Sequence, residues 1–216
     1  MVLHVRVIFV IRLHLVTMAL GKLAQYPNWF RILISEEGPW VLKEWDGDSS
    51  LSCHMRTLHF YETFSGVGNQ AYEVSREKLN VKEFDYVTHR RQNIFEEAGL
   101  RECVRTTCMI VRFGGHHYAP VCKSWGFLNS SNTRRHLDPT GDVSYSATRI
   151  GNRQVDLVTL LMRLDYDLEV YSIVEQPSRS VMFKYPPMAK VCKQIGCKSY
   201  SCAMGNFYGP TQKSHR

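Results

Sequence analysis

The amino-acid sequence predicts an α/β fold, built on a mostly parallel sheet with helices on both faces. Short apolar segments that suit strands alternate along the chain with segments of helical periodicity. The segment Leu58 to Phe64 leads into a glycine turn, Gly66 to Gly68, that opens a predicted helix. This arrangement is typical of α/β domains that bind nucleotide-like ligands. The 216 residues, 44% of them hydrophobic and 22% charged, suit one globular domain of moderate size.

The first 52 residues are expected to form an amino-terminal extension, and residues 53–216 the α/β domain. Val2 to Leu20 is strongly apolar, but Arg6 and Arg12 interrupt it. Each central arginine costs about 2.5–3.5 kcal/mol on insertion scales, and a signal peptide carries its charge ahead of its apolar segment. We therefore expect no membrane partner. The alternation of apolar and polar residues here favours an additional strand, and an extension without defined structure is the alternative.

The elements of the domain follow in order along the chain. The glycines Gly114 and Gly115 are expected to end the second helix. Ser130 to Asp142 is polar and rich in turn-forming residues, so it is expected to be a loop over the site. Strands are expected at Leu58–Phe64, Val81–Phe84, His117–Val121, Val170–Val174 and Lys198–Met204, and helices at Asn69–Leu79, Phe95–Val111 and Ala147–Leu164.

Residues after the first two strands of the domain predict a cofactor pocket. Ligands of open α/β sheets bind outside the carboxyl ends of the strands, so the strand ends should meet at one crevice. Gly66 and Gly68 permit close approach of the backbone to a ligand. Asp85 is the candidate to accept ribose hydroxyls, with Glu83 as the weaker candidate. The alternative is a glycine turn that serves only the packing of helix against strand.

Two later strands are expected to end in reactive side chains. Cys122 follows Pro120 and has Lys123 beside it, and nearby positive charge raises the fraction of thiolate, which is the nucleophilic form. The alternative is a buried thiol that fills space beneath the loop. Glu175 follows the next strand. It is expected to act on a ligand or, alternatively, to pair with an arginine such as Arg179.

The order of these motifs resembles that of the cytosine-5 DNA methyltransferases over roughly Leu58 to Gln212. The variant motifs Pro-Val-Cys-x-Ser-Trp and Glu-Gln-Pro are closest to an uncharacterised microalgal lineage of methyltransferase-like proteins. The resemblance implies a Rossmann-like methyltransferase sheet that is incomplete at its carboxyl end. The segments that carry it are Phe64-Ser65-Gly66-Val67-Gly68, Asp85, Pro120-Val121-Cys122, Glu175-Gln176-Pro177 and Tyr208-Gly209-Pro210-Thr211-Gln212.

The resemblance also implies roles for individual residues. Cys122 would attack ring carbon six of cytosine, and Glu175 would hold the edge of the base. The cofactor implied is S-adenosylmethionine. Its expected binding residues are Glu62, Phe64, Ser65, Gly66, Gly68, Asp85 and Pro120. Val121 and the pair Gln176-Pro177 depart from the family pattern. The alternative function is therefore a catalytically inactive domain of the same fold that binds nucleic acid or a protein partner.

Charge and aromatic residues indicate the partner. The formal charge of +7 and the isoelectric point near 9.1 favour an acidic partner such as nucleic acid. Arg134 and Arg135, with Arg149 and Arg153, are predicted to contact phosphates. Trp125 is predicted to stack on a base, with core packing as the alternative. No target-recognition region fits within the sequence, so a partner protein is a further candidate for selecting the target.

The seven cysteines indicate an intracellular protein without a metal site. Their number is odd and their spacing irregular, which is typical of reduced thiols rather than of a secreted disulfide framework. Cys192, Cys197 and Cys202 recur every five residues, a spacing that does not match paired zinc ligands. His116 and His117 are adjacent in a predicted strand and should face opposite sides of the sheet. They are therefore expected to form neither a joint metal site nor a catalytic pair.

Overall fold

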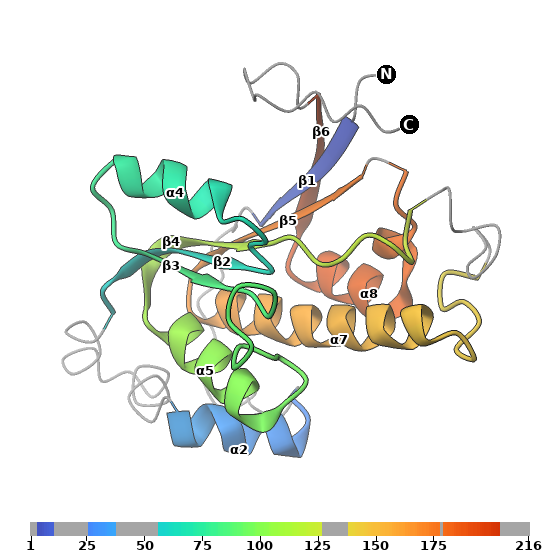
Figure 1. The fold of residues 1–216 in the computed structure, drawn as a ribbon, viewed down its shortest axis with the longest axis horizontal. Helices are drawn as coiled ribbons and strands as arrows, with labels where there is room; N and C mark the ends of the chain where they lie inside the picture. Colours follow the sequence, from blue (N-terminus) through green and yellow to red (C-terminus); the bar gives the residue numbers. More distant parts are fainter. Residues whose placement is uncertain (1–3, 11–25, 38–55, 127–137, 178, 204–216) are drawn as a thin grey trace.

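The chain folds into an α/β structure with a mostly parallel, Rossmann-like sheet, as the sequence predicts (Figure 1). The computed structural model describes residues 4–10, 26–37, 56–126, 138–177 and 179–203. Over these residues one sheet of six strands has the order β3-β2-β4-β5-β1-β6. The strands are β1 (His4–Val10), β2 (Leu58–Thr63), β3 (Val81–Phe84), β4 (Ile110–Tyr118), β5 (Tyr171–Pro177) and β6 (Cys197–Ala203).

Four neighbouring strands, from the β3 edge of the sheet to β5, are parallel, and the first strand of the chain runs antiparallel beside them. β3, β2, β4 and β5 pair in parallel, whereas β1 is antiparallel to both β5 and β6. Val7 of β1 lies opposite Glu175 on one side and Tyr200 on the other. Of the two alternatives for the amino-terminal extension, the additional strand therefore holds for His4–Val10. The domain boundary predicted at residue 52 lies outside the described residues.

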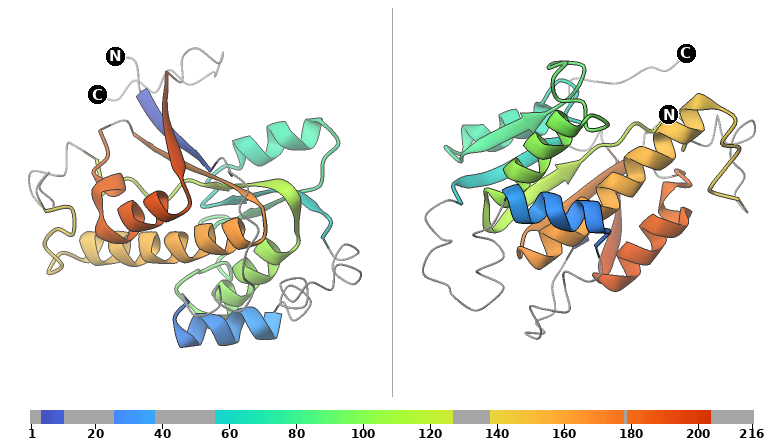
Figure 2. Two further views of the ribbon diagram at one scale, coloured as in Figure 1. Left: turned by 180° about the vertical axis from the view of Figure 1, so that it is seen from behind. Right: turned by 90° about the horizontal axis from the view of Figure 1, so that it is seen from below.

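Helices cover both faces of the sheet. The helix α4 lies on one face, and α5 and α7 lie on the other (Figure 1). Figure 2 shows α8 beside α7, and α2 beside α5. No helix in the described ranges is long and apolar enough to cross a membrane. The helices are α2 (Asn28–Glu37), α4 (Asn69–Arg76), α5 (Glu97–Cys108), α7 (Ser146–Asp167) and α8 (Pro186–Gln194), with a short 3-10 helix, η1, at Met182–Lys184.

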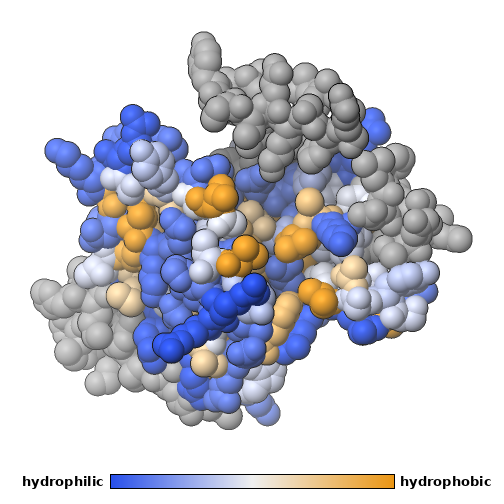
Figure 3. Space-filling model, viewed as in Figure 1, coloured by the Kyte–Doolittle hydropathy of each residue, from blue (hydrophilic) through white to orange (hydrophobic). Residues whose placement is uncertain are grey.

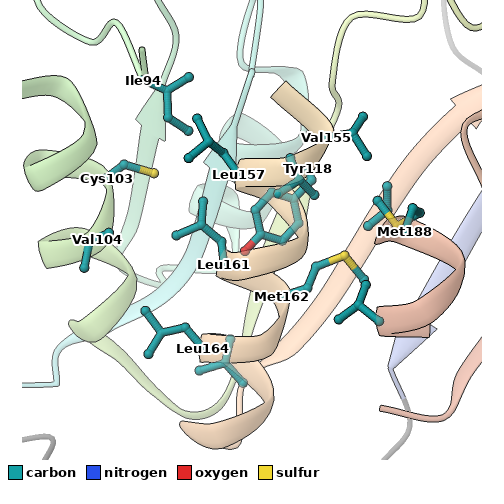
Figure 4. Packing of buried hydrophobic residues seen from close by; sticks show 14 of the residues in the cluster. Ile94, Cys103, Val104, Tyr118, Val155, Leu157, Leu161, Met162, Leu164 and Met188 are labelled. Carbon is teal, nitrogen blue, oxygen red and sulfur yellow. The ribbon is translucent and has the colours of Figure 1, made fainter. Parts of the chain in front are cut away.

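The apolar core is centred on α7. Leu161, Met162 and Leu164 of this helix are fully buried. Figure 4 shows them between Val104 of α5 and Met188 of α8. Burying one such side chain stabilises the fold by about 1.5–3 kcal/mol. The long apolar stripe of α7 therefore holds the other helices of this face against the sheet.

A buried polar network also joins α7 to the sheet. The carboxylate of Asp165 accepts hydrogen bonds from the hydroxyls of Tyr118 and Ser172, both at 2.7 Å. Its other oxygen lies 3.0 Å from Nδ1 of His116, and Nε2 of His116 lies 2.8 Å from the hydroxyl of Thr63. All five side chains are buried. Buried polar groups are tolerated when they are hydrogen-bonded, so this network fixes β2, β4 and β5 relative to α7.

The start of β4 differs from the prediction. The helix α5 ends at Cys108, and Gly114 and Gly115 lie inside β4 instead of ending the helix. The pairing with β2 shifts between Leu58 and Phe60, which indicates a bulge in β4. A Cβ atom on Gly114 would lie 2.9 Å from the carbonyl oxygen of His59. These glycines are therefore explained by the close approach of β2.

Candidate active site

The glycine turn after β2 opens α4, as the sequence predicts. Phe64, Gly66 and Gly68 have φ values of 65°, 58° and 68°, so the backbone is left-handed at three positions within five residues. A Cβ atom on Gly68 would collide with the carboxylate of Glu83, whereas one on Gly66 would meet no atom within 4 Å. Packing against β3 therefore accounts for Gly68. At Gly66 the turn borders open space.

Asp85 braces this turn from the end of β3. One carboxylate oxygen accepts a hydrogen bond from the amide of Gly66 at 2.9 Å, and the other accepts one from the amide of Val87 at 2.6 Å. The residue is 8% exposed. The structure brings Asp85 to the turn, but its first partners are backbone amides. A carboxylate oxygen accepts more than one hydrogen bond, so the predicted contact with a ribose would add to these bonds.

Glu62, His117 and Glu175 form a line across three neighbouring strands. Oε2 of Glu62 accepts a hydrogen bond from the amide of Ala71, in the first turn of α4, at 2.8 Å. Oε1 of Glu62 lies 3.6 Å from Nδ1 of His117. Nε2 of His117 lies 3.4 Å from Oε2 of Glu175. The side chains of Glu62 and His117 are buried, and that of Glu175 is 27% exposed. Only the last member of the line therefore has substantial access to solvent.

The two carboxylates favour a charged imidazole. Burial alone lowers the pKa of His117, but hydrogen bonding and charge from Glu175 and Glu62 outweigh burial and raise the pKa above its ordinary value of 6.5. His116 faces Asp165 on the other side of the sheet, so the predicted opposite orientation of the two histidines is confirmed. The contact of His117 with Glu175 was not predicted. The available signal was that both residues belong to strands expected to be neighbours.

Cys122 lies on an exposed segment after β4. The strand ends at Tyr118, earlier than predicted, and the thiol of Cys122 is exposed. The alternative of a buried thiol is therefore excluded. The side-chain amide of Gln176 donates a hydrogen bond to the carbonyl oxygen of Pro120 at 2.5 Å. The amide of Val121 donates one to Oε1 of Gln154 at 3.1 Å. The segment that carries Cys122 is thus attached to both β5 and α7.

Of the residues predicted to contact nucleic acid, Trp125 lies within the described part of the chain. Trp125 is fully buried, and its ring packs against that of Tyr185 with centroids 5.3 Å apart. The prediction that Trp125 stacks on a base is therefore wrong, and the core-packing alternative holds. Arg134 and Arg135 lie outside the described residues, as does most of the predicted loop around them. The segment Tyr208–Gln212 is also outside them.

The two arginines of α7 bind backbone carbonyls. Arg149 donates hydrogen bonds to the carbonyl oxygens of Val143 and Ser144 at 2.9 and 2.7 Å. Arg153 donates one to the carbonyl oxygen of Phe95 at 3.0 Å and lies over the Phe95 ring. These bonds give both arginines a structural role at the amino end of α7. Each guanidinium has five N–H donors, so a contact with phosphate would add to these bonds.

Exposed valines rim the site. Val67, Val87 and Val121 follow β2, β3 and β4, and they are 83%, 77% and 58% exposed. Figure 3 shows separate hydrophobic patches among hydrophilic residues on one face of the molecule. Apolar side chains beside a few polar groups are usual at sites for organic ligands. The rim therefore suits a ligand that is partly apolar, such as a nucleoside.

Metal binding finds no support in the part of the chain that the structure describes. No group of three or more His, Cys, Asp or Glu side chains there is arranged to hold a metal ion. The thiols of Cys192 and Cys197 lie within hydrogen-bonding reach of each other, and this bond lowers the pKa of Cys192. Cys192 lies in α8 and Cys197 is the first residue of β6, so the turn between these elements separates the two cysteines in the sequence.

No family model, curated protein or solved structure matches the chain. The functional assignment therefore rests on the site itself. An exposed thiol, a partly exposed carboxylate and a glycine turn beside open space come from three neighbouring strands of one sheet, β4, β5 and β2. This set consists of a candidate nucleophile, a carboxylate that can accept hydrogen bonds from a ligand, and a stretch of backbone that a ligand can approach.

Proposed function

We propose that the chain is an S-adenosylmethionine-binding, methyltransferase-like domain that methylates cytosine in nucleic acid through Cys122. The observation that carries the proposal is the exposure of Cys122 on a segment that Gln176 fixes to β5. Gln176 directly follows Glu175. The hydrogen bond to Pro120 supports the proposal because it ties the segment of the candidate nucleophile to the strand of the candidate base-holding carboxylate.

The surroundings of the glycine turn fit the cofactor. Gly66 borders open space, and the exposed apolar residues Val67 and Val87 follow β2 and β3. Asp85 lies at the turn with lone pairs left for ribose hydroxyls. Glu62 was expected to bind the cofactor directly, but its carboxylate holds the first turn of α4. When bound, S-adenosylmethionine supplies an electrophilic methyl group, and the residues of the turn would orient it.

The proposed chemistry assigns distinct tasks to two side chains. The thiolate of Cys122 forms a bond to ring carbon six of cytosine, which makes carbon five nucleophilic. Glu175 holds the polar edge of the base and stabilises the charge that develops there. After carbon five has taken the methyl group, a water molecule removes the proton from carbon five. The electrons of that C–H bond form the ring double bond as the bond to Cys122 breaks and releases the thiolate. The thiolate is thereby regenerated, so Cys122 needs access to substrate and no permanent partner.

A non-catalytic binding domain is the second candidate. The exposed Val67, Val87 and Val121 favour it, because apolar side chains at neighbouring strand ends are also suited to packing against a partner protein. In that case the site would bind its partner without forming a covalent bond. Substitution of Cys122 by serine would then leave binding of the partner unchanged.

Calorimetry with S-adenosylmethionine tests the cofactor site, and the chain offers a matched control. Gly66 and Gly196 have φ values of 58° and 70°, and a Cβ atom on either would meet no atom within 4 Å. Valine at either position should cost about 1–2 kcal/mol of stability through left-handed strain. Only Gly66→Val should abolish binding, since Gly196 lies in the turn before β6. Absence of binding heat from the unsubstituted protein at millimolar cofactor would refute the proposal.

A further inference from the structure

The buried imidazole of His117 lies beside two carboxylates, although one is enough to balance its charge. A buried charge needs a partner, and Glu62 is one: it is buried and anchored to the amide of Ala71. Glu175 is the other, and it reaches solvent at the end of β5. The line therefore runs from a fixed, buried carboxylate through His117 to the residue proposed to hold the target base.

We infer that His117 is a positioning residue that acts through Glu175 and serves as the proton reserve of the site. The inference rests on the proposed function. Nε2 of His117 lies 3.4 Å from Oε2 of Glu175, which directs one carboxylate oxygen inward and leaves the other for the base. The Phe60 ring stacks on the imidazole with centroids 6.4 Å apart and an interplanar angle of 19°. The imidazole is therefore packed on its face and has Glu175 beside Nε2, whereas Nδ1 has no hydrogen-bond partner among the described residues and lies 3.6 Å from Oε1 of Glu62.

The proton transfer balances without any further reactant. When Cys122 adds to the base, electron density moves toward the ring nitrogen at the edge held by Glu175. The proton of Nε2 of His117 passes to the inner oxygen of Glu175, the carboxyl group turns about its Cγ–Cδ bond, and the ring nitrogen takes the proton from Glu175. Glu175 ends as a carboxylate, and His117 ends as a neutral imidazole. Elimination of Cys122 returns the proton along the same line.

Charged side chains from the two neighbouring strands face His117. Glu62 faces it from β2, and Glu175 faces it from β5. The helix α4, on this face of the sheet, contributes the amide of Ala71 to Glu62. Both carboxylates raise the pKa of the imidazole, so a larger fraction of His117 is charged at neutral pH than of an ordinary histidine. Removing either charge should lower that pKa.

The test measures formation of a covalent adduct as a function of pH. The probe is a single-stranded oligonucleotide with a fluorinated cytosine, in the presence of S-adenosylmethionine. His117→Gln retains a donor toward Glu175 but cannot carry a proton. We expect it to form adduct about 100-fold more slowly at neutral pH, because a positioned acid contributes about 10²–10⁴-fold. We also expect it to lose the decline in rate that the wild type shows as pH rises through the His117 pKa.

Two further variants keep the test decisive. Glu62→Gln retains the acceptor for Ala71 and should move the decline in rate to lower pH, and it carries the test if His117→Gln does not fold. His59→Gln, on the same sheet but bound to Asn80, should change neither rate nor profile. Adduct formation by His117→Gln at the wild-type rate, with the wild-type pH profile, would overturn this inference alone. Failure of the wild type to form any adduct would instead overturn the proposed function.

Discussion

Removing the carboxylate of Asp165 tests whether the buried network fixes α7 to the sheet. Asp165→Ala takes the acceptor away from Tyr118, Ser172 and His116 at once. One rearrangement of protons can give Tyr118 a new hydrogen-bond acceptor. Nδ1 of His116 already lies 2.8 Å from the Tyr118 hydroxyl, and Nε2 lies 2.8 Å from Thr63. If the proton moves to Nε2, Tyr118 can donate to Nδ1 instead.

The expected cost follows from what is left unpaired. With this rearrangement only the hydroxyl of Ser172 loses its acceptor, at about 1–3 kcal/mol, and the strong bonds to a charged acceptor are replaced by neutral ones. Together these changes should lower the free energy of unfolding by about 3–5 kcal/mol. At about 2–4 °C for each kcal/mol, the unfolding midpoint should fall by roughly 6–20 °C.

Thermal and urea unfolding followed by circular dichroism measure this change. Asp142→Ala is the control, since Asp142 is exposed and lies before α7, and it should shift the midpoint far less. Adding Tyr118→Phe to Asp165→Ala should destabilise the protein further only if Tyr118 has moved its bond to His116, and by less than Tyr118→Phe costs alone, because a neutral acceptor has replaced the carboxylate. A loss below about 1 kcal/mol for Asp165→Ala would refute the account of the network.

Three further outcomes are expected. Iodoacetamide should label Cys122 much faster than Cys103, whose burial raises its pKa to about 12, and peptide mass spectrometry over time measures both rates; equal rates would contradict the exposure of Cys122. The wild type should have a larger free energy of unfolding than His117→Gln, and this difference should be fully present below about pH 6.5 and lost as pH rises through the raised His117 pKa. Urea titrations at several pH values measure the difference. Gly114→Ala should lower the unfolding midpoint because its Cβ would lie 2.7 Å from Cγ2 of Ile110; a midpoint equal to that of wild type would mean that the bulge relaxes freely.

The regular elements of the domain could be predicted because their hydrophobic patterns are local. Val81–Phe84 is a strand with the predicted bounds, and Ser146–Asp167 extends the predicted helix by only a few residues. The start of β4 could not be predicted in this way. Ile110 to Phe113 directly follows α5, and the need for Gly114 arises from the backbone of β2, which is distant in the sequence.

The site could be predicted as a set of strand ends but not as a set of contacts. The position of Asp85 at the end of β3 follows from the strand pattern, whereas Glu175 lies inside β5, which continues to Pro177 beyond its predicted end at Val174. The partner of Glu175 depends on the register of three strands, which brought His117 beside it. Trp125 lies in a segment without periodicity, so its packing against Tyr185 could not be distinguished from exposure. Its burial shows that an aromatic residue near a reactive one is weak evidence for base stacking.

Covalent trapping on Cys122 tests the central claim most directly. The protein is incubated with S-adenosylmethionine and a single-stranded oligonucleotide that carries a fluorinated cytosine, which cannot lose the group on carbon five. We expect a stable protein–nucleic-acid adduct, with the modified peptide containing Cys122 in mass spectra. Cys122→Ser should lose the adduct and retain cofactor binding, because the thiol and Gly66 belong to different strand ends. No adduct from a wild-type protein that binds the cofactor, or an adduct on another cysteine, would contradict the assignment.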